Sequence, residues 1–261
     1  MPLVTTRSIV LQTYRYSDTS KILRLMTREH GPLSALARGA LRPKSRFGGL
    51  LEPFAEGDAT FYLKEGRDLH TLSSFELHRA RRDLAHDLGR LSGASVAAEL
   101  VMRLAPEHRD DRLYGGLHAS LDAISDVPDE AVAATVLSCV WQLVATLGFE
   151  PELTGCLECG RPIGNEEGTR FDFAAGGVRC GGCSPHGRSL DAAALASLRA
   201  LATGVPTVES HGPQIELLTD FINYHMTEGA RLRSLPFLAE LDRARPGDPR
   251  AWSVPAVSRP G

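Results

Sequence analysis

The chain has 261 residues, of which 43% are hydrophobic and 23% are charged. This length favours two domains over one, and the apolar share is ordinary for a chain that folds around its own core. No stretch approaches the ~18 consecutive apolar residues of a membrane span, and the N-terminus lacks the apolar segment of a secretory signal. We therefore expect a cytoplasmic protein with no membrane contact, in which paired cysteines indicate metal or redox chemistry rather than disulfides.

Charge is distributed unevenly along the chain. Residues 1–80 contain 12 Lys and Arg against 8 Asp and Glu, whereas the remainder contains 17 against 24. The first part is expected to attract anions and the second part cations or nothing, although a chance fluctuation would give similar counts.

Residues 1–77 have the short alternating patterns of β-strands. Alternation is clearest where Ala59, Phe61 and Leu63 share one face, and turn residues separate the segments. Five short strands with one long connection indicate a small barrel of the OB type, a pattern that other five-stranded barrels share. The predicted strands are residues 9–16, 21–27, 33–37, 59–63 and 69–75.

The long connection, Arg38–Pro53, is basic and rich in glycine. It has four positive charges and no acid before Glu52, and Pro43 prevents a long helix. A mobile basic loop on a barrel is suited to binding phosphates, but a solvated linker would have the same composition. The candidate phosphate-binding residues of the loop are Arg38, Arg42, Lys44 and Arg46.

Further cations lie in the first two predicted strands. Arg15, Lys21 and Arg24 complete the candidate DNA-binding set. Lys21 and Arg24 differ by three residues and so point to opposite faces of one strand. Both can line the same groove only if one of them lies at the strand end.

Aromatic residues near these cations are candidates for stacking on nucleobases. Single-stranded nucleic acid is bound by a basic groove combined with aromatic faces. Phe61 and Phe75 are expected in the barrel core, which leaves Tyr14, Tyr16 and Tyr62 as the stacking candidates. These tyrosines could equally lie on the barrel surface without a ligand.

From Arg79 onward the apolar residues recur with a helical period. Asp129 is a candidate N-cap for the helix that carries Trp141, and Cys139 on the same stripe is expected to be a small buried residue rather than a ligand. The apolar stripes lie at residues 84–91, 96–104, 113–124, 136–147, 191–201 and 215–225.

Cys156, Cys159, Cys180 and Cys183 form two C-x2-C pairs. Two residues between ligands let one turn aim both sulfurs at a single ion, and two such turns complete a tetrahedron. Four thiolates leave no coordination position for a substrate, so one structural zinc ion is expected. The alternative, a redox dithiol, requires a single pair at the start of a helix.

The fold class that follows is α+β, with an N-terminal five-stranded OB-type barrel and a helical domain into which a four-cysteine zinc finger is inserted. The tail is rich in Pro and Gly and is expected to be disordered. The expected domains are an OB-fold DNA-binding domain at 1–78, helical parts at 79–152 and 189–244, the zinc finger at 153–188 and the tail at 245–261.

No pattern in the chain indicates catalysis. The phosphate-binding loop G-x-x-x-x-G-K-[ST], the dinucleotide-binding G-x-G-x-x-G and the hydrolase elbow G-x-S-x-G are all missing from the sequence. The nine histidines are scattered, with no pair at metal-ligand spacing. We therefore expect a protein that is not an enzyme.

At this level of detail the chain resembles the bacterial RecO family of recombination mediators and DNA-repair proteins. The segment LMTREHGPLSALARGALRPKSRFGGLLEPF, residues 25–54, is similar to the basic signature of that family. DLHTLSSFEL at 68–77 fits its last barrel strand, GFEPELTGCLECG at 148–160 the start of its zinc finger, and SLDAAALASLRAL at 189–201 the helix that follows. The similarity covers residues 4–241 in the same order, although some members lack the cysteines.

The resemblance implies a protein of the bacterial nucleoid that binds single- and double-stranded DNA and anneals complementary strands. It further implies work with RecR, which together with this protein helps load RecA onto single-stranded DNA coated by the single-strand binding protein SSB. The C-terminal tail of SSB would bind in the helical domain. Under this hypothesis, the basic loop and the cations of the first two strands hold phosphates.

Two other interpretations also fit the sequence. The first is a non-catalytic, zinc-stabilised adaptor whose acidic helical region binds proteins and whose barrel is only a scaffold. The second is a metallohydrolase with an unrecognised site. An adaptor binds no oligonucleotide at low salt, and a hydrolase shows turnover.

Overall fold

A computed structural model of the chain describes residues 2–63, 66–85, 87–164, 167–183, 186–207, 211–225 and 232–238. The predicted disordered tail at 245–261 and the end of the second helical part lie outside the described residues. The chain splits into two compact units. The first contains Met1–Arg82 and Ala98–Asp122, and the second contains Asp83–Ala97 and Ala123–Gly261.

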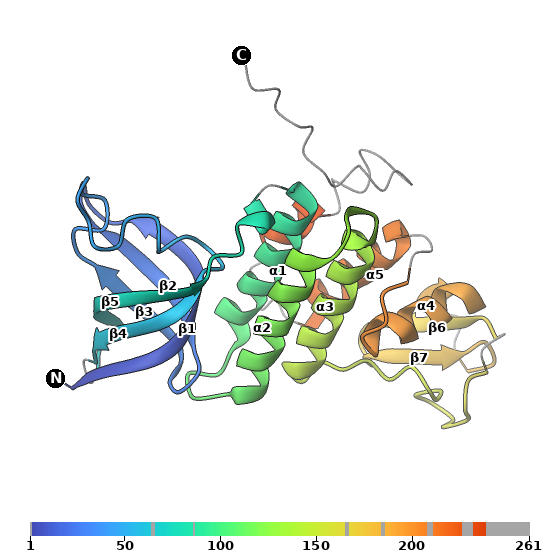
Figure 1. Ribbon diagram of the computed structural model, residues 1–261. Helices are drawn as coiled ribbons and strands as arrows, with labels where there is room; N and C mark the ends of the chain where they lie inside the picture. The colour runs from blue at the N-terminus through green and yellow to red at the C-terminus, as the bar shows by residue number, and fades with distance from the viewer. Residues whose placement is uncertain are drawn as a thin grey trace, which may run out of the picture. The chain divides into compact units, whose positions relative to one another are not determined.

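The first unit contains a closed five-stranded barrel with the strand order β1-β2-β3-β5-β4 (Figure 1). Only β3 and β5 pair in parallel, and the other neighbours are antiparallel. This order confirms the predicted OB-type barrel. The strands are β1 (Leu3–Arg15), β2 (Lys21–Thr27), β3 (Gly31–Ala37), β4 (Glu56–Tyr62) and β5 (Leu69–Arg79).

Four of the five barrel strands are longer than the sequence predicted, and β1 and β5 differ the most. β1 begins at Leu3 rather than Ile9, because its first half pairs with β4, and β5 continues to Arg79 opposite Glu56. The extra residues are mostly polar on their outer face, as in the pair Arg7 and Asp58. Polar residues in a strand do not give the apolar alternation on which the prediction relied.

The barrel interior is filled by the inward-facing residues of all five strands. Leu23, Ala35, Phe61 and Leu72 are almost completely buried there, together with Phe75. Phe61 and Phe75 are therefore core residues, as predicted. Removing a buried aromatic ring of this kind costs about 3–5 kcal/mol of stability.

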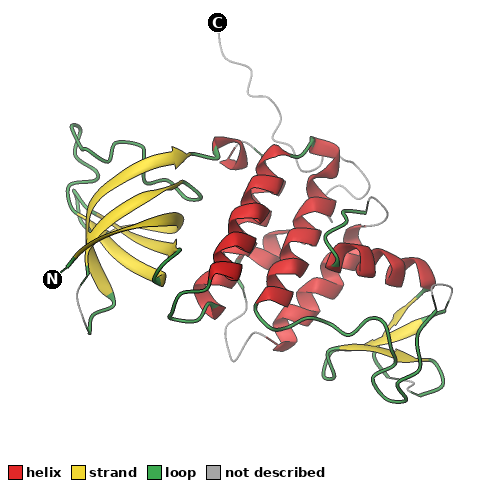
Figure 2. Ribbon diagram, turned by 60° about the horizontal axis from the view of Figure 1, so that its bottom comes forward, coloured by secondary structure: helices red, strands yellow, loops and turns green. Residues whose placement is uncertain are grey.

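The helices confirm the predicted stripes with changed bounds, and Figure 2 draws them in red. The stripes at 84–91 and 96–104 belong largely to one helix, α1, after a short 3-10 turn. In the second unit, α3 packs against α4 and α5, and the Trp141 ring lies 5.2 Å from that of Phe221. Cys139 of α3 is buried, as predicted. The elements are η1 (Arg82–Ala85), α1 (Leu88–Leu104), α2 (Asp111–Asp126), η2 (Asp129–Ala131), α3 (Val132–Thr146), α4 (Ala192–Ala202) and α5 (His211–His225).

The predicted N-cap role of Asp129 is wrong. Asp129 lies in η2, and α3 begins three residues later with Ala131 in the cap position. The carboxylate of Asp129 accepts a hydrogen bond from Arg90 Nη1 at 2.8 Å, which withdraws it from the helix end. Asp191, by contrast, does cap α4 and accepts from the backbone N–H of Ala194 at 2.7 Å.

A small three-stranded sheet carries part of the cysteine segment. Its strands are β6 (Thr169–Asp172), β7 (Gly177–Cys180) and β8 (Arg188–Leu190), in the order β7-β6-β8. Among the described helices, none combines the length and the continuous apolar character of a membrane-spanning segment.

Candidate functional site

The basic loop, Arg38–Pro53, is anchored to the barrel. It runs as a series of turns. Its side chains Phe47 and Leu51 are buried in the barrel core, and Leu41 N–H donates to Thr19 O at 3.0 Å. The loop is therefore a fixed element of the barrel rather than the free linker that its composition also allowed.

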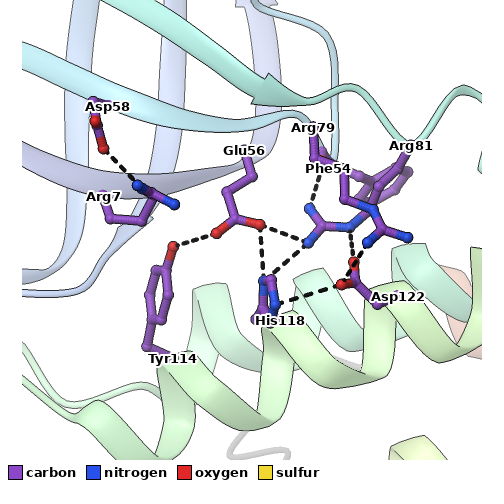
Figure 3. Close-up of polar contacts among 9 residues, drawn as sticks. All are labelled: Arg7, Phe54, Glu56, Asp58, Arg79, Arg81, Tyr114, His118 and Asp122. Carbon is purple, nitrogen blue, oxygen red and sulfur yellow. Dashed lines mark hydrogen bonds and ion pairs between the residues drawn. The ribbon is translucent and has the colours of Figure 1, made fainter.

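The end of the basic loop is fixed by a buried ionic network (Figure 3). Arg81 has a fully buried side chain, and its Nη1 donates to the carbonyl oxygen of Phe54 at 2.9 Å. The same guanidinium donates to Glu56 at 2.7 Å and to Asp122 of α2 at 2.5 Å. Phe54 and Arg81 are the only non-glycine residues of the described chain with a positive φ, 68° and 44°, and this hydrogen bond joins them.

Glu56 is the acid at the centre of this network. It accepts hydrogen bonds from the Tyr114 hydroxyl at 3.1 Å and from His118 Nδ1 at 2.8 Å, both on α2. Burial raises the pKa of Glu56, but the hydrogen bond and charge of Arg81, and then those of His118, outweigh burial and lower that pKa. Glu56 is therefore a buried carboxylate that depends on its cationic partner.

Two of the candidate DNA-binding cations already have acidic partners. Arg15 Nη2 lies 3.1 Å from Asp18, and Lys21 Nζ lies 3.1 Å from Glu52 of the basic loop. Lys21 begins β2, so it lies at a strand end and reaches the loop while Arg24 points outward. Exposed pairs of this kind are worth about 0–1 kcal/mol, so a phosphate can compete with either acid.

The other candidate cations have no acidic partner among the residues that the structure describes. All of them are exposed. The Arg46 guanidinium lies over the Phe47 ring, 4.9 Å from its centroid, so a buried residue of the loop fixes the position of this cation. Because four of these cations share one fixed loop, their positive charge is concentrated rather than spread over a flexible chain. They are Arg24, Arg38, Arg42, Lys44 and Arg46.

The two cysteine pairs come together because each lies on a backbone turn, and the first turn is hydrogen-bonded to β7, which leads into the second turn. Leu157 N–H donates to Val178 O at 3.0 Å, which joins the first pair to β7. Gly177 makes this approach possible, since a Cβ there would lie 2.3 Å from Glu152 O. In the described residues this is the only group of potential ligands that could hold a metal: all four sulfurs lie within 4.8 Å of one another.

The electrostatics of this cluster fit a cation. Backbone N–H groups of Cys159 and Cys180 lower the pKa of Cys156 to about 6, and Arg161 lowers that of Cys180. The sulfurs of Cys180 and Cys159 raise the pKa of Cys183 to about 12. Four thiolates this close repel one another unless a metal lies between them, and tetrahedral zinc bonds of about 2.3 Å would set the sulfurs about 3.8 Å apart. Cys159 Sγ and Cys180 Sγ are 4.0 Å apart.

Comparison with known proteins places the chain in a family. Residues 1–81 match the family described as "Recombination protein O N terminal", and residues 85–235 match "Recombination protein O C terminal". The chain belongs to the RecO family. Its relatives carry the name "DNA repair protein RecO", and the chain is accordingly a RecO-family DNA repair protein.

Curated RecO proteins resemble the chain over most of its length. The RecO protein of Anaeromyxobacter dehalogenans (strain 2CP-C) is 36% identical over 253 residues, which is 92% of this chain and 98% of that relative. The RecO protein of Symbiobacterium thermophilum is 35% identical over 209 residues, 78% of this chain and 81% of the relative. The RecO protein of Pelobacter propionicus is 32% identical over 242 residues, 90% and 96% respectively.

In this RecO-family chain, the ionic network beside the basic loop has almost no signature in the sequence. The one local signal was the spacing of His118 and Asp122, which places them on one helix face. Glu56 and Arg81 give no such signal, because their partners are distant in sequence. His118 looked like one of several scattered histidines.

Proposed function

We propose that this RecO-family protein binds single- and double-stranded DNA through its barrel, with the basic loop neutralising phosphates. The observation that carries the proposal is the anchored row of exposed loop cations, none paired with an acid among the described residues. Fixed cations release condensed counterions from DNA when they bind, which favours association without any base being read. Arg15 and Lys21 also bind phosphates once a phosphate has displaced the acidic residues with which they pair, Asp18 and Glu52.

Such a surface supports the annealing of complementary strands. Two strands repel each other through their phosphates, and the loop lowers that repulsion when it neutralises one of them. Contacts to the backbone leave the Watson–Crick edges free to pair. No catalytic group is needed for this step, so the protein acts as a mediator and not as an enzyme.

Family membership supports the remaining parts of the proposal. With RecR, the protein helps load RecA onto single-stranded DNA that is coated by SSB, and it binds the C-terminal tail of SSB through its helical region. These steps take place where the chromosome lies, in the bacterial cytoplasm. The four cysteines hold one zinc ion, whose role is to join the two turns of the cysteine segment, because a full set of four thiolates leaves no position for a substrate.

The test of DNA binding is fluorescence anisotropy with labelled oligonucleotides over a range of salt concentrations. Replacing Arg38, Arg42, Lys44 and Arg46 with Ala should weaken binding and flatten the slope of log K against log salt by about 0.7 per lost contact on single strands. The control is Arg109→Ala/Arg112→Ala, which removes exposed arginines before and in α2. An unchanged slope in the loop variant removes the loop from the interface.

The test of mediation is the annealing of complementary strands coated with SSB, with and without the protein. Acceleration that disappears in the loop variant supports the proposal. If metal-loaded protein binds no oligonucleotide at low salt, the zinc-stabilised adaptor is the better description.

A further inference from the structure

A single arginine of α4 holds both ends of the turn that carries the first cysteine pair. Arg199 Nη2 donates to Leu153 O at 2.7 Å and to Ile163 O at 2.9 Å. Arg199 Nε donates to Leu153 O as well, at 3.0 Å. One of these carbonyls precedes the cysteine pair and the other follows it, so the guanidinium joins the two ends of the segment. We call this segment, residues 153–163, the first cysteine turn.

Backbone hydrogen bonds continue the closure that Arg199 begins. Ile163 N–H donates to Thr154 O at 2.9 Å, and Cys156 N–H donates to Arg161 O at 2.9 Å. From the ends of the turn toward its tip, the bonds of Arg199 come first and these two bonds follow. The position of the first sulfur ligand therefore depends on how firmly the ends of the turn are held together.

Arg199 itself is fixed by the helical part of the second unit, to which the cysteine segment also belongs. Its helix, α4, packs against α3 and α5. Ser138 Oγ of α3 donates to Leu201 O at 3.1 Å, and Gln214 Nε2 of α5 donates to Ala194 O at 2.9 Å. The neighbouring helices thus set the position of α4, and α4 sets the position of the guanidinium.

This arrangement matters for a metal because ligand residues lose freedom when they bind one. The free energy of binding must order the turns that carry the sulfurs, unless something else has already ordered them. Hydrogen bonds from a charged donor are stronger than those between neutral groups, so the contacts of Arg199 are well suited to this task. They order the first cysteine turn without occupying a coordination position.

We infer that Arg199 is a positioning residue of the zinc site, which presets the first cysteine turn for the metal and couples metal binding to α4. This inference rests on the proposed zinc binding. Coupling between two events is reciprocal, so zinc stabilises the contacts of α4 by the same factor by which Arg199 strengthens zinc binding. Loss of the metal is therefore felt in α4 and not only in the cysteine segment.

The chain offers a matched control for Arg199. Arg188 of β8 also links the cysteine segment to a helix, because its Nη2 donates to Asp220 of α5 at 2.7 Å. This pair is partly exposed and does not involve the first cysteine turn. Replacement by Met keeps most of the aliphatic stem of either arginine and removes its donors.

The first measurement is zinc affinity, by competition with a chromophoric pyridylazo chelator. Arg199→Met should weaken zinc binding by about 10-fold, the lower end of the range for residues that orient metal ligands. Arg199→Lys should recover part of this loss, because one nitrogen, Nη2, already contacts both carbonyls. Arg188→Met should bind zinc as the unchanged protein does.

The second measurement is hydrogen exchange with and without zinc. In the unchanged protein, removing zinc should speed exchange in α4 as well as in the cysteine segment. In Arg199→Met, exchange in α4 should be the same in both states, whereas β7 should still respond to zinc. If Arg199 only stabilised α4, its replacement would speed exchange there and leave the response to zinc intact. The comparison in the unchanged protein needs no variant to fold.

The results separate this inference from the proposed zinc binding. If Arg199→Met binds zinc as tightly as the unchanged protein, or if exchange in α4 of the unchanged protein ignores zinc, Arg199 does not position the site. The four cysteines then still hold the metal. If the unchanged protein binds no zinc, the proposed zinc site and this inference both fail.

Discussion

The sharpest stability prediction concerns Arg81, the cation of the buried network. Replacing it with Met keeps most of the side-chain volume and removes the charge. Arg81→Met leaves Glu56 buried without its main counter-charge, and it leaves the carbonyl oxygen of Phe54 without its donor. Asp122 is less affected, because Arg79 Nη1 also donates to it at 2.9 Å.

The expected cost follows from the burial of these groups. Removing one partner of a buried ion pair costs about 3–5 kcal/mol, because the remaining charge is desolvated without compensation. The hydrogen bonds of Tyr114 and His118 to Glu56 remain, which places the expected cost toward the lower end. Even about 3 kcal/mol is a large part of the 5–15 kcal/mol that ordinarily stabilises a folded domain.

The cost also depends on pH, and its sign follows from Glu56. In the unchanged protein the pKa of Glu56 is lowered, so the carboxylate contributes stability above its unfolded pKa of about 4.3 and loses it as the pH falls. In Arg81→Met burial dominates and raises the pKa of Glu56 above the unfolded value. Deprotonation of Glu56 then destabilises the variant as the pH rises through this raised pKa. The difference in unfolding free energy between the variant and the unchanged protein should therefore be larger at pH 7.5 than at pH 5.

The assay is urea unfolding followed by circular dichroism at these two pH values. Arg82→Met is the control, since the neighbouring Arg82 is exposed and its replacement should cost under about 0.5 kcal/mol. Adding Glu56→Gln to Arg81→Met should recover part of the loss at pH 7.5 and remove the pH dependence. If Arg81→Met unfolds within about 1 kcal/mol of the unchanged protein at both pH values, the network is not the buried ion pair described here.

Three further outcomes are expected. Glu52→Gln should release Lys21, strengthen DNA binding and steepen the salt slope by about 0.7, whereas Glu76→Gln, the same charge change at another exposed acid, should leave the slope unchanged in anisotropy titrations. Purified protein should contain one zinc per chain. A chelator that removes the zinc should speed hydrogen exchange across residues 153–190 and leave exchange in the barrel as it was. Equal exchange with and without metal would argue against the zinc site. Asp191→Ala should lower the free energy of unfolding by about 1 kcal/mol, since it removes the N-cap hydrogen bond to Ala194, and a thermal melt unchanged from that of the parent protein would contradict it.

Several features could be predicted because their signals are local. Alternation of apolar residues located the barrel strands, and a helical period located α2, α4 and most of α5. The spacing of Cys156, Cys159, Cys180 and Cys183 predicted that their sulfurs meet, because each pair needs only one tight turn. The positions of Lys21 and Arg24 on opposite faces of β2 also followed from the two-residue period of a strand.

Other features depended on partners that the sequence does not specify. Asp129 looked like a helix cap, but Arg90, which is 39 residues away, takes its carboxylate. Composition alone could not say that Phe47 anchors the basic loop in the core, or that Glu52 neutralises Lys21. The Tyr14 and Tyr62 rings were equivalent candidates until the strand order placed Arg24 near one of them.

Strands, helices and the convergence of four sulfurs can be predicted from the amino-acid sequence, since they depend on neighbours within a few positions. Which charges are free for a ligand and which are already paired becomes known only once the chain is folded. The buried network joins three segments that are distant in sequence: β4, the residues after β5, and α2. Its members Glu56, Arg81 and His118 meet only when the barrel closes and α2 lies beside the end of β5. Long-range pairing of this kind is set by the strand order and by burial, and no local pattern encodes it.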